Sequence, residues 1–139
     1  MTAIDVPPGF EAISSGKDRY ASGLGPFYRK PLADGRWLFG FRAEPRHLNS
    51  NQIVHGGCLM SFADEMLGIT VHFAAGRRRC ATISLSNEFV SAAKEGEWIL
   101  GTPEVVRVTR SVVFVRGTLT VEDRTILTSS GIWKLIGQH

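Results

Sequence analysis

The sequence predicts an α+β fold in which an antiparallel sheet wraps around one long central helix, and three observations support this. Apolar residues recur at three- and four-residue steps across residues 57–75, which is the periodicity of a helix. Four strand-like runs follow, divided by short separators. The 139 residues suffice for one core, because a domain of this length buries roughly 70% of its unfolded surface.

Residues 1–35 are expected to form an N-terminal extension with a short helix and a loop. The stretch PPGFEAI predicts a short helix opened by proline. The glycine- and proline-rich stretch SGLGPFYRKPLADG predicts a loop around a short extended piece. The first clear strand is RWLFGFRA, at residues 36–43. The sequence contains no repeat or interdomain linker, so we expect residues 1–139 to form a single domain.

The four later strands are expected in the runs CATISLSNEFVSA, EWILGTPEVVRVT, SVVFVRGTLTVE and TILTSSGIWKLI. Their separators AKEGE, RS and DR have the lengths of hairpin connections. An antiparallel sheet built from these strands has to wrap the apolar helix in order to bury it.

Composition and charge exclude several classes of protein. With 43% hydrophobic and 21% charged residues, the chain is typical of a globular protein. Its start lacks the regions of a secretory signal, and acids interrupt its longest apolar run, so we expect neither export nor a membrane span. Two cysteines without CxxC spacing argue against a disulfide scaffold and a zinc site. We therefore expect a cytoplasmic protein without a metal.

The basic residues are scattered, apart from Arg77, Arg78 and Arg79, although the formal net charge is +3. No RNA-binding aromatic pattern, zinc finger or helix-turn-helix signature accompanies this triplet, so nucleic-acid binding is not expected. The triplet is either a solvated loop after the helix or a contact for a phosphate group, and Arg110 is a second candidate for such a contact.

The helix entry His55-Gly56-Gly57 offers unpaired backbone N–H groups and the positive end of the helix dipole. Glycines let another molecule approach such donors closely. A preset donor lowers the barrier to attack on a carbonyl group by roughly 3 to 4 kcal/mol. The N–H of Gly56 or Gly57 is therefore a candidate oxyanion donor, and a simple tight turn is the alternative.

Two adjacent carboxylates, Asp64 and Glu65, lie within this apolar helix. Burial raises the pKa of a carboxyl group unless donors compensate, and this makes the group a better general base. Such a carboxylate either activates water or attacks a carbonyl group as a nucleophile. These residues alone do not decide which of the two acids reacts.

The helix entry and the acids are too far apart to act together in one chain. Gly56 and Asp64 are eight residues apart, or about 12 Å along a helix. An attacking group and its oxyanion donor must both lie about 3 Å from one reacting centre. We therefore expect a homodimer in which each chain gives the entry to one site and the acid to the other.

The order of elements and the length of the helix resemble the hotdog fold, and the motifs make the resemblance specific. The segment NSNQIVHGGCLMSFADEMLG is similar to the Asn, His-Gly-Gly and helical Asp segment of hotdog acyl-CoA thioesterases of the phenylacetate-degradation (PaaI-like) type. The stretches ATISLSNEFVSAAKEGEWI and VTRSVVFVRGTL resemble later parts of the same family, so residues 36–136 are covered. Gln52 and Ala92 depart from the family, which usually has Gly and Pro there.

The resemblance implies hydrolysis of an acyl-CoA thioester to a carboxylic acid and CoA, without a cofactor. It implies that Asp64 is the catalytic carboxylate, that Thr82 positions the water, and that the amide of Asn49 lies near the thioester oxygen. It also implies dimers with shared sites, which often pair into tetramers. The pocket walls are expected to include Phe62 and Met66, and the arginines named above are expected near the phosphates of CoA.

Two other functions remain open. A hotdog hydratase or dehydratase would need a His–Asp or His–Glu pair for proton transfer to carbon, and His55 supplies one member of such a pair. A noncatalytic acyl-thioester binding protein would keep the fold without turnover, but the joint presence of the entry motif, Asn49, Asp64 and Thr82 argues against it. A serine-hydrolase elbow, a P-loop and a dinucleotide fingerprint are absent from the sequence.

Overall fold

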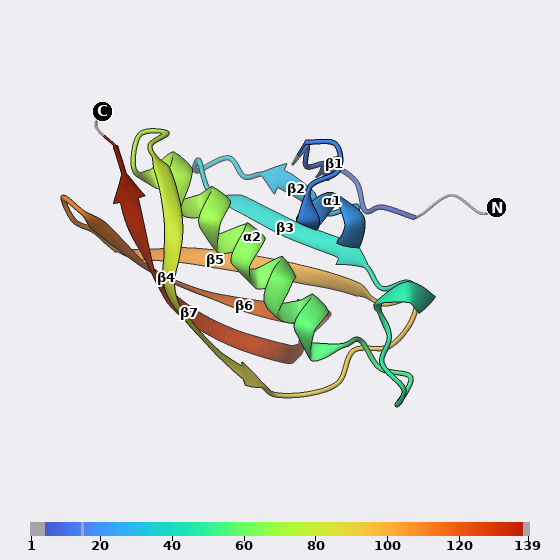
Figure 1. The fold of residues 1–139 in the computed structure, drawn as a ribbon. Helices are drawn as coiled ribbons and strands as arrows, with labels where there is room; N and C mark the ends of the chain where they lie inside the picture. The colour runs from blue at the N-terminus through green and yellow to red at the C-terminus, as the bar shows by residue number, and fades with distance from the viewer. Residues whose placement is uncertain (1–4, 15, 138–139) are drawn as a thin grey trace.

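One long helix lies across the concave face of a seven-stranded antiparallel sheet (Figure 1). The computed structural model of the chain describes residues 5–14 and 16–137. The strands follow the spatial order β1-β2-β3-β5-β6-β7-β4. The elements are β1 (Glu11–Ala12), α1 (Tyr20–Leu24), β2 (Tyr28–Pro31), β3 (Trp37–Arg42), the 3-10 turn η1 (Pro45–His47), α2 (Gly56–Ala74), β4 (Arg79–Phe89), β5 (Trp98–Val108), β6 (Val112–Val121) and β7 (Arg124–Ile136).

The predicted central helix and the five strands from residue 36 onward are confirmed to within about three residues at their ends. Helix α2 begins after His55, whose Nδ1 accepts a 2.8 Å hydrogen bond from the Gly57 N–H and caps the first turn. It ends at Ala74 with Ala75 as its C-cap, and Gly76 and Arg77 then adopt left-handed φ angles of 71° and 67° that turn the chain back into β4.

Three local predictions differ from the structure. The stretch PPGFEAI is not helical, because Gly9 has a φ of 88° and β1 then pairs with β2. The short helix α1 instead begins just before the stretch predicted as a loop and ends within it, while β2 is the extended piece expected there. The separator AKEGE does not close a hairpin, because β4 pairs with β7 at one edge of the sheet and β5 pairs with β3 and β6 near its middle.

The core lies between α2 and the sheet. The rings of Phe27, Phe41 and Phe62 pack together with centroid separations of 4.8 to 5.3 Å. Gly101 and Gly117 let the helix approach the strands closely, since a Cβ at either position would lie within 2.8 Å of the Met66 side chain. The sheet therefore wraps the helix and holds its outward side at one open face, as the hotdog arrangement predicts.

Candidate active site

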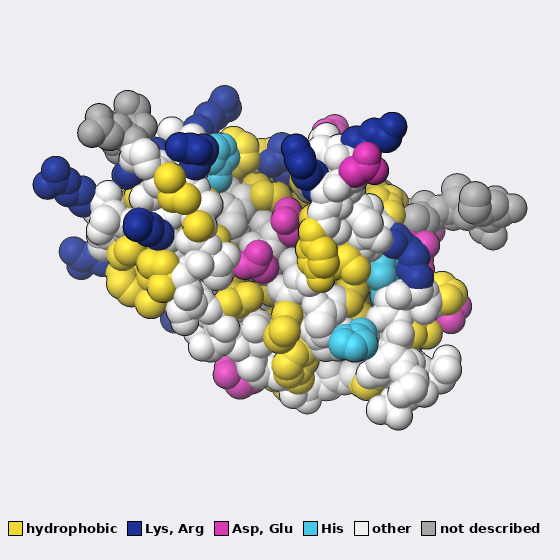
Figure 2. Space-filling view, viewed as in Figure 1, with side chains coloured by type: hydrophobic (Ala, Val, Ile, Leu, Met, Phe, Trp, Pro, Cys, Tyr) yellow, Lys and Arg dark blue, Asp and Glu magenta, His cyan; other side chains and the backbone are white. Residues whose placement is uncertain are grey.

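Asp64 and Thr82 form a hydrogen-bonded pair between the middle of α2 and the start of β4. The Thr82 hydroxyl donates to Oδ1 of Asp64 at 2.7 Å. Both residues line a cavity of about 510 Å³ that runs along the open side of α2, between β4 and the N-terminal segment. Acidic side chains lie near the centre of this face, and Lys and Arg side chains gather around the end where α2 stops and β4 begins (Figure 2).

Strand β4 contains a bulge directly after Thr82. Thr82 pairs with Trp133 of β7 whereas Ser84 pairs with Ile132, so Ile83 is an extra residue in β4. Such bulges change the direction of neighbouring side chains and are common beside active sites. The predicted pair of an acid and a hydroxyl residue is thus brought together from two elements.

Glu65 lines the same cavity as Asp64 but makes no hydrogen bond with its side chain among the described residues. It also lines a neighbouring cavity of about 250 Å³ beside α1. Burial raises the pKa of the Glu65 carboxyl, and the charge of Asp64 adds to this effect. Since both acids are half-buried, burial does not distinguish them, and the hydrogen bond from Thr82 is what sets Asp64 apart.

At the helix entry, only one of the two predicted N–H donors remains free. The Gly57 N–H is used in the cap by the His55 ring. Within residues 5–14 and 16–137, the Gly56 N–H makes no hydrogen bond, so it is the donor that a ligand can reach. Phe89 lies close by, because a Cβ on Gly56 would meet its ring at 3.1 Å.

Asn49 holds the loop that leads to this entry. Its Oδ1 accepts hydrogen bonds from the backbone N–H groups of Asn51, at 2.9 Å, and Ile53, at 3.4 Å. This is an Asx-type turn, in which the side-chain oxygen replaces a backbone acceptor. The structure therefore shows a role for Asn49 in shaping the loop, and its predicted contact with a thioester stays a prediction.

Within one chain, the helix entry at Gly56 is too far from Asp64 for both residues to contact the same reacting group. Gly56 and Asp64 lie on one uninterrupted helix, so their separation of eight residues corresponds to about 12 Å. His55 lies a further residue away, and its Nδ1 is engaged in the cap. A His–carboxylate pair of the hydratase kind is therefore not formed between His55 and Asp64 within one chain.

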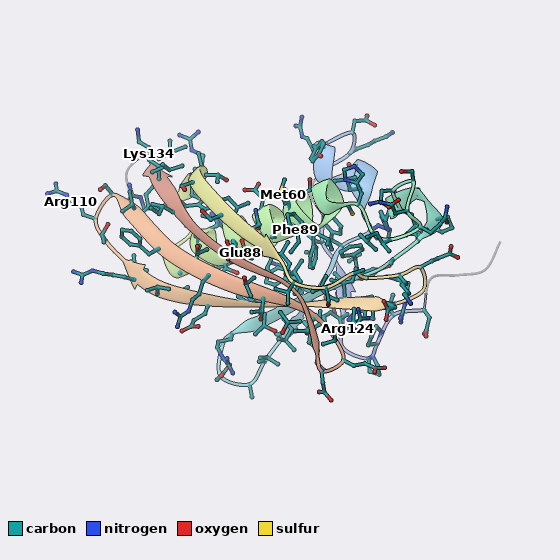
Figure 3. The ribbon with its side chains drawn as sticks, turned by 90° about the horizontal axis from the view of Figure 1, so that it is seen from below. Met60, Glu88, Phe89, Arg110, Arg124 and Lys134 are labelled. Carbon is teal, nitrogen blue, oxygen red and sulfur yellow. The ribbon has the colours of Figure 1, made fainter. Side chains whose placement is uncertain are left out.

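The predicted arginines fall into two groups. Arg78 is a structural residue, because its guanidinium donates to the carbonyl oxygens of Arg110, at 3.1 Å, and Gly137, at 2.5 Å. Arg78 and Arg110 line a cavity of about 590 Å³ at the C-terminal end of α2, which does not include Asp64. Arg77 and Arg79 are exposed. Figure 3 shows Arg110 at the tip of the β5–β6 turn.

The expectation that Phe62 and Met66 form pocket walls is corrected by the structure. Phe62 is fully buried and Met66 is 1% exposed, and neither lines the cavity beside Asp64. Each lies two positions from Asp64, and two helical residues rotate a side chain by about 200°. The side chains two positions before and two positions after Asp64 therefore point into the core.

Four polar residues of the cavity were not among the predicted site residues, namely Ser14, Arg29, His72 and Cys80. The His72 Nδ1–H donates a 2.7 Å hydrogen bond to the Arg78 carbonyl oxygen, and the Cys80 thiol donates weakly to the Gly68 carbonyl oxygen. Asp64, Gly68 and His72 recur at four-residue steps, so helical periodicity alone places His72 on the same side as the acid. Arg29 carries no such signal.

A family model that matches more than half of the chain decides to which family the chain belongs. The family model described as "Thioesterase superfamily" matches residues 51–128, which include the entry motif, Asp64 and Thr82. The chain belongs to the thioesterase superfamily. This thioesterase is a thioester hydrolase, and its matched segment contains all of α2 and β4 to β6.

Other similar proteins agree with this assignment. The thioesterase is 26% identical to "Putative esterase PA0474" of Pseudomonas aeruginosa over 133 residues, which cover 95% of this chain and 98% of the relative. The BH2602 protein from Bacillus halodurans with CoA has a TM-score of 0.78 at 18% identity, over 88% of this chain and 82% of its own. The E. coli PaaI protein has a TM-score of 0.74 at 19% identity, over 87% and 86%. The predicted PaaI-like hotdog fold is confirmed.

The helix of this thioesterase carries its acids on the open side and its apolar residues toward the sheet. In the part of the chain that the structure describes, no helix combines the length and the apolar character needed to cross a membrane.

Proposed function

We propose that this thioesterase hydrolyses an acyl-CoA thioester to a carboxylic acid and CoA, with Asp64 as the general base. The observation that carries the proposal is the 2.7 Å hydrogen bond from Thr82 to Asp64 inside the cavity along α2. The CoA carrier is supported by the solved BH2602 structure, which contains CoA and shares the fold. CoA is part of the substrate, and the reaction needs no further cofactor.

In this mechanism one water molecule lies beside the hydrogen-bonded Asp64 and Thr82 side chains and contacts both of them. The Thr82 hydrogen is used in the bond to Oδ1, so its oxygen accepts one hydrogen bond from the water while Asp64 removes the other proton. The water oxygen bonds to the thioester carbon, and the carbon–sulfur bond then breaks. The proton held by Asp64 passes to the departing thiolate, which restores the carboxylate.

The negative charge on the carbonyl oxygen is stabilised by the Gly56 N–H of a second chain. Gly56 has the free donor at the positive end of α2, and the 12 Å separation prevents it from serving Asp64 of its own chain. Each dimer therefore has two sites, and each site takes its acid from one chain and its oxyanion donor from the other.

The surface that pairs the two chains includes the free edge of β4. β4 is an outer strand of the sheet and pairs only with β7 among the described strands. Four large apolar side chains at this edge and on the nearby helix are 40–56% exposed: Met60, Ile83, Phe89 and Val90. An exposed apolar edge strand is a template for pairing with another chain. Figure 3 labels Met60 and Phe89 from α2 and β4. Association of two dimers into a tetramer stays a prediction.

A panel of acyl-CoA thioesters with short, medium and aromatic acyl groups tests this function. Release of CoA is followed with a thiol-detecting reagent, and sedimentation measures the oligomeric state. Hydrolysis by the wild type that is lost in Asp64→Asn supports the proposal. Absence of hydrolysis across the panel, or a monomer with full activity, contradicts it.

A further inference from the structure

The cavity beside Asp64 extends well beyond the reacting pair. Its remote end is formed by Arg29 of β2 and by His72 and Phe73 near the end of α2. Phe73 lies nine residues after Asp64 on the same helix, which corresponds to about 13.5 Å. A molecule that reacts at Asp64 and fills this cavity therefore reaches the Arg29 end with an atom roughly that far from its thioester.

Arg29 is held against aromatic rings at this end. Its strand register places it opposite Phe39, which is fully buried, so its side chain is on the inner face of the sheet. The guanidinium carbon lies 4.4 Å from the Trp37 ring centroid and 5.5 Å from that of Phe73. Both rings therefore lie within cation–π distance of the guanidinium and stabilise its position at this end of the cavity.

The Arg29 guanidinium forms no ion pair among the described residues, not even with Glu11, which lies opposite it in β1. The five ion pairs found there use other arginines. Asp64 and Glu65 share the cavity but lie outside salt-bridge distance, and His72 is already bonded to a backbone carbonyl. A half-buried guanidinium with free N–H donors is suited to a carboxylate or a phosphate, either of which it binds through two parallel hydrogen bonds.

We propose that Arg29 is a specificity residue that binds an anionic group of the substrate at the end of the cavity remote from Asp64. The inference rests on the proposed thioester hydrolysis. Two parts of an acyl-CoA carry such a group at this distance: a carboxylate at the far end of a dicarboxylic acyl chain, and a phosphate beyond the pantetheine arm. Both offer oxygens in the geometry that the guanidinium fork recognises.

Binding is measured by calorimetry in an Asp64→Asn background, so that turnover does not interfere. The four ligands are dodecanoyl and dodecanedioyl thioesters, whose twelve-carbon chains are long enough to cross the cavity, each on CoA and on N-acetylcysteamine, which lacks phosphates. Arg29→Gln should raise Kd about tenfold or more only for ligands with the recognised anion. Weakening of both dodecanedioyl esters identifies the carboxylate, and weakening of both CoA esters identifies a phosphate.

Lys30→Gln is the matched control, because Lys30 is the next residue of β2, faces away from this cavity, and also places its cation over a ring, that of Phe10. It should leave all four Kd values unchanged. Arg29→Lys keeps the positive charge but lacks the planar guanidinium that makes two parallel hydrogen bonds. It should weaken binding less than Arg29→Gln. Equal changes for all four ligands, no change, or equal effects of the Arg29 and Lys30 variants would overturn the proposal. A wild type that binds these ligands through Arg29 but hydrolyses none rejects only the proposed function.

Discussion

The Thr82 hydroxyl donates a 2.7 Å hydrogen bond to Oδ1 of Asp64 and so connects the edge strand β4 to the middle of α2. The bond orients the carboxylate toward the cavity, and within the described residues the second oxygen of Asp64 accepts no hydrogen bond. A carboxylate with one oxygen fixed and one oxygen available has the arrangement that a general base requires.

Replacing Asp64 by Asn should lower kcat for the best acyl-CoA at least about a hundredfold, because an amide cannot accept the proton of water. The isosteric amide keeps an acceptor for Thr82, so circular dichroism and sedimentation should match the wild type. Near-normal turnover in Asp64→Asn would refute the assignment.

Replacing Thr82 by Val should lower kcat roughly tenfold to a hundredfold, because the attacking water then lacks the hydroxyl that positions it. The matched variant Thr82→Ser keeps the hydroxyl and should stay close to wild type.

A single turnover in ¹⁸O-labelled water distinguishes the base from the nucleophile. With enzyme in excess over the thioester, a general base places the label in the released acid in the first turnover. A nucleophilic Asp64 forms an anhydride, and hydrolysis at the aspartyl carbon then leaves the label in the protein. Mass spectrometry of the acid and of the peptide that contains Asp64 measures both. Label in the peptide would show that our choice of general base is wrong.

Replacing Glu65 by Gln should stabilise the protein at neutral pH while reducing activity much less than Asp64→Asn. Burial raises the pKa of Glu65, so the folded state holds this proton more tightly than the unfolded state. The free energy of unfolding therefore falls as pH rises from the ordinary value of about 4.3 through the raised pKa. Glu65→Gln cannot lose stability in this way, so its free energy of unfolding should exceed that of the wild type at pH 7. The difference should shrink toward pH 4.

Urea unfolding of Glu65→Gln across that pH range provides the measurement. Glu95→Gln serves as the control, since it removes an exposed carboxylate in the connection between β4 and β5. It should differ little from wild type at either pH. If Glu65→Gln is the inactive variant and Asp64→Asn is active, the reacting acid is Glu65.

The sequence predicted the elements whose signal is local. The apolar steps along α2 and the alternation in the later strands come from residues a few positions apart, and their bounds agree closely with the structure. The strand order was harder to predict, because a five-residue separator suits either a hairpin or the crossing connection that carries the chain from β4 to β5. The stretch PPGFEAI was misassigned because the left-handed glycine at position 9 outweighs the helix-initiating prolines.

The pairing of Thr82 with Asp64 was predictable only through the resemblance, because nothing in the strand pattern distinguishes Thr82 from its neighbours. The extra residue at Ile83 depends on pairing with β7, which begins more than 40 residues later. Arg29 was unpredictable for the same reason, since its rings come from β3 and the end of α2. By contrast, the burial of Phe62 and Met66 follows from the rotation of the helix and should have been predicted from the position of Asp64.

Mixing two inactive variants tests the shared site. Gly56→Pro removes the N–H donor at a position where a helix tolerates proline, and Gly56→Ala is its matched control because it adds a Cβ near Phe89 but keeps the N–H. We expect Gly56→Pro to lose most activity and Gly56→Ala to retain much more. A difference between these two variants assigns the effect to the donor rather than to contact with the Phe89 ring.

When Gly56→Pro and Asp64→Ala chains are mixed and exchanged, each heterodimer contains one site with both lesions and one site with neither. Such a dimer should have about half the activity of the native dimer. Random exchange puts about half of the dimers in the mixed form, so the mixture should recover about a quarter of native activity. Sedimentation confirms that heterodimers form, and a mixture of Asp64→Ala with itself gives the baseline. Verified heterodimers without activity would show that Gly56 and Asp64 do not complement each other across the interface, because a site built from two chains must be restored whenever one dimer holds an intact copy of each residue in the right place.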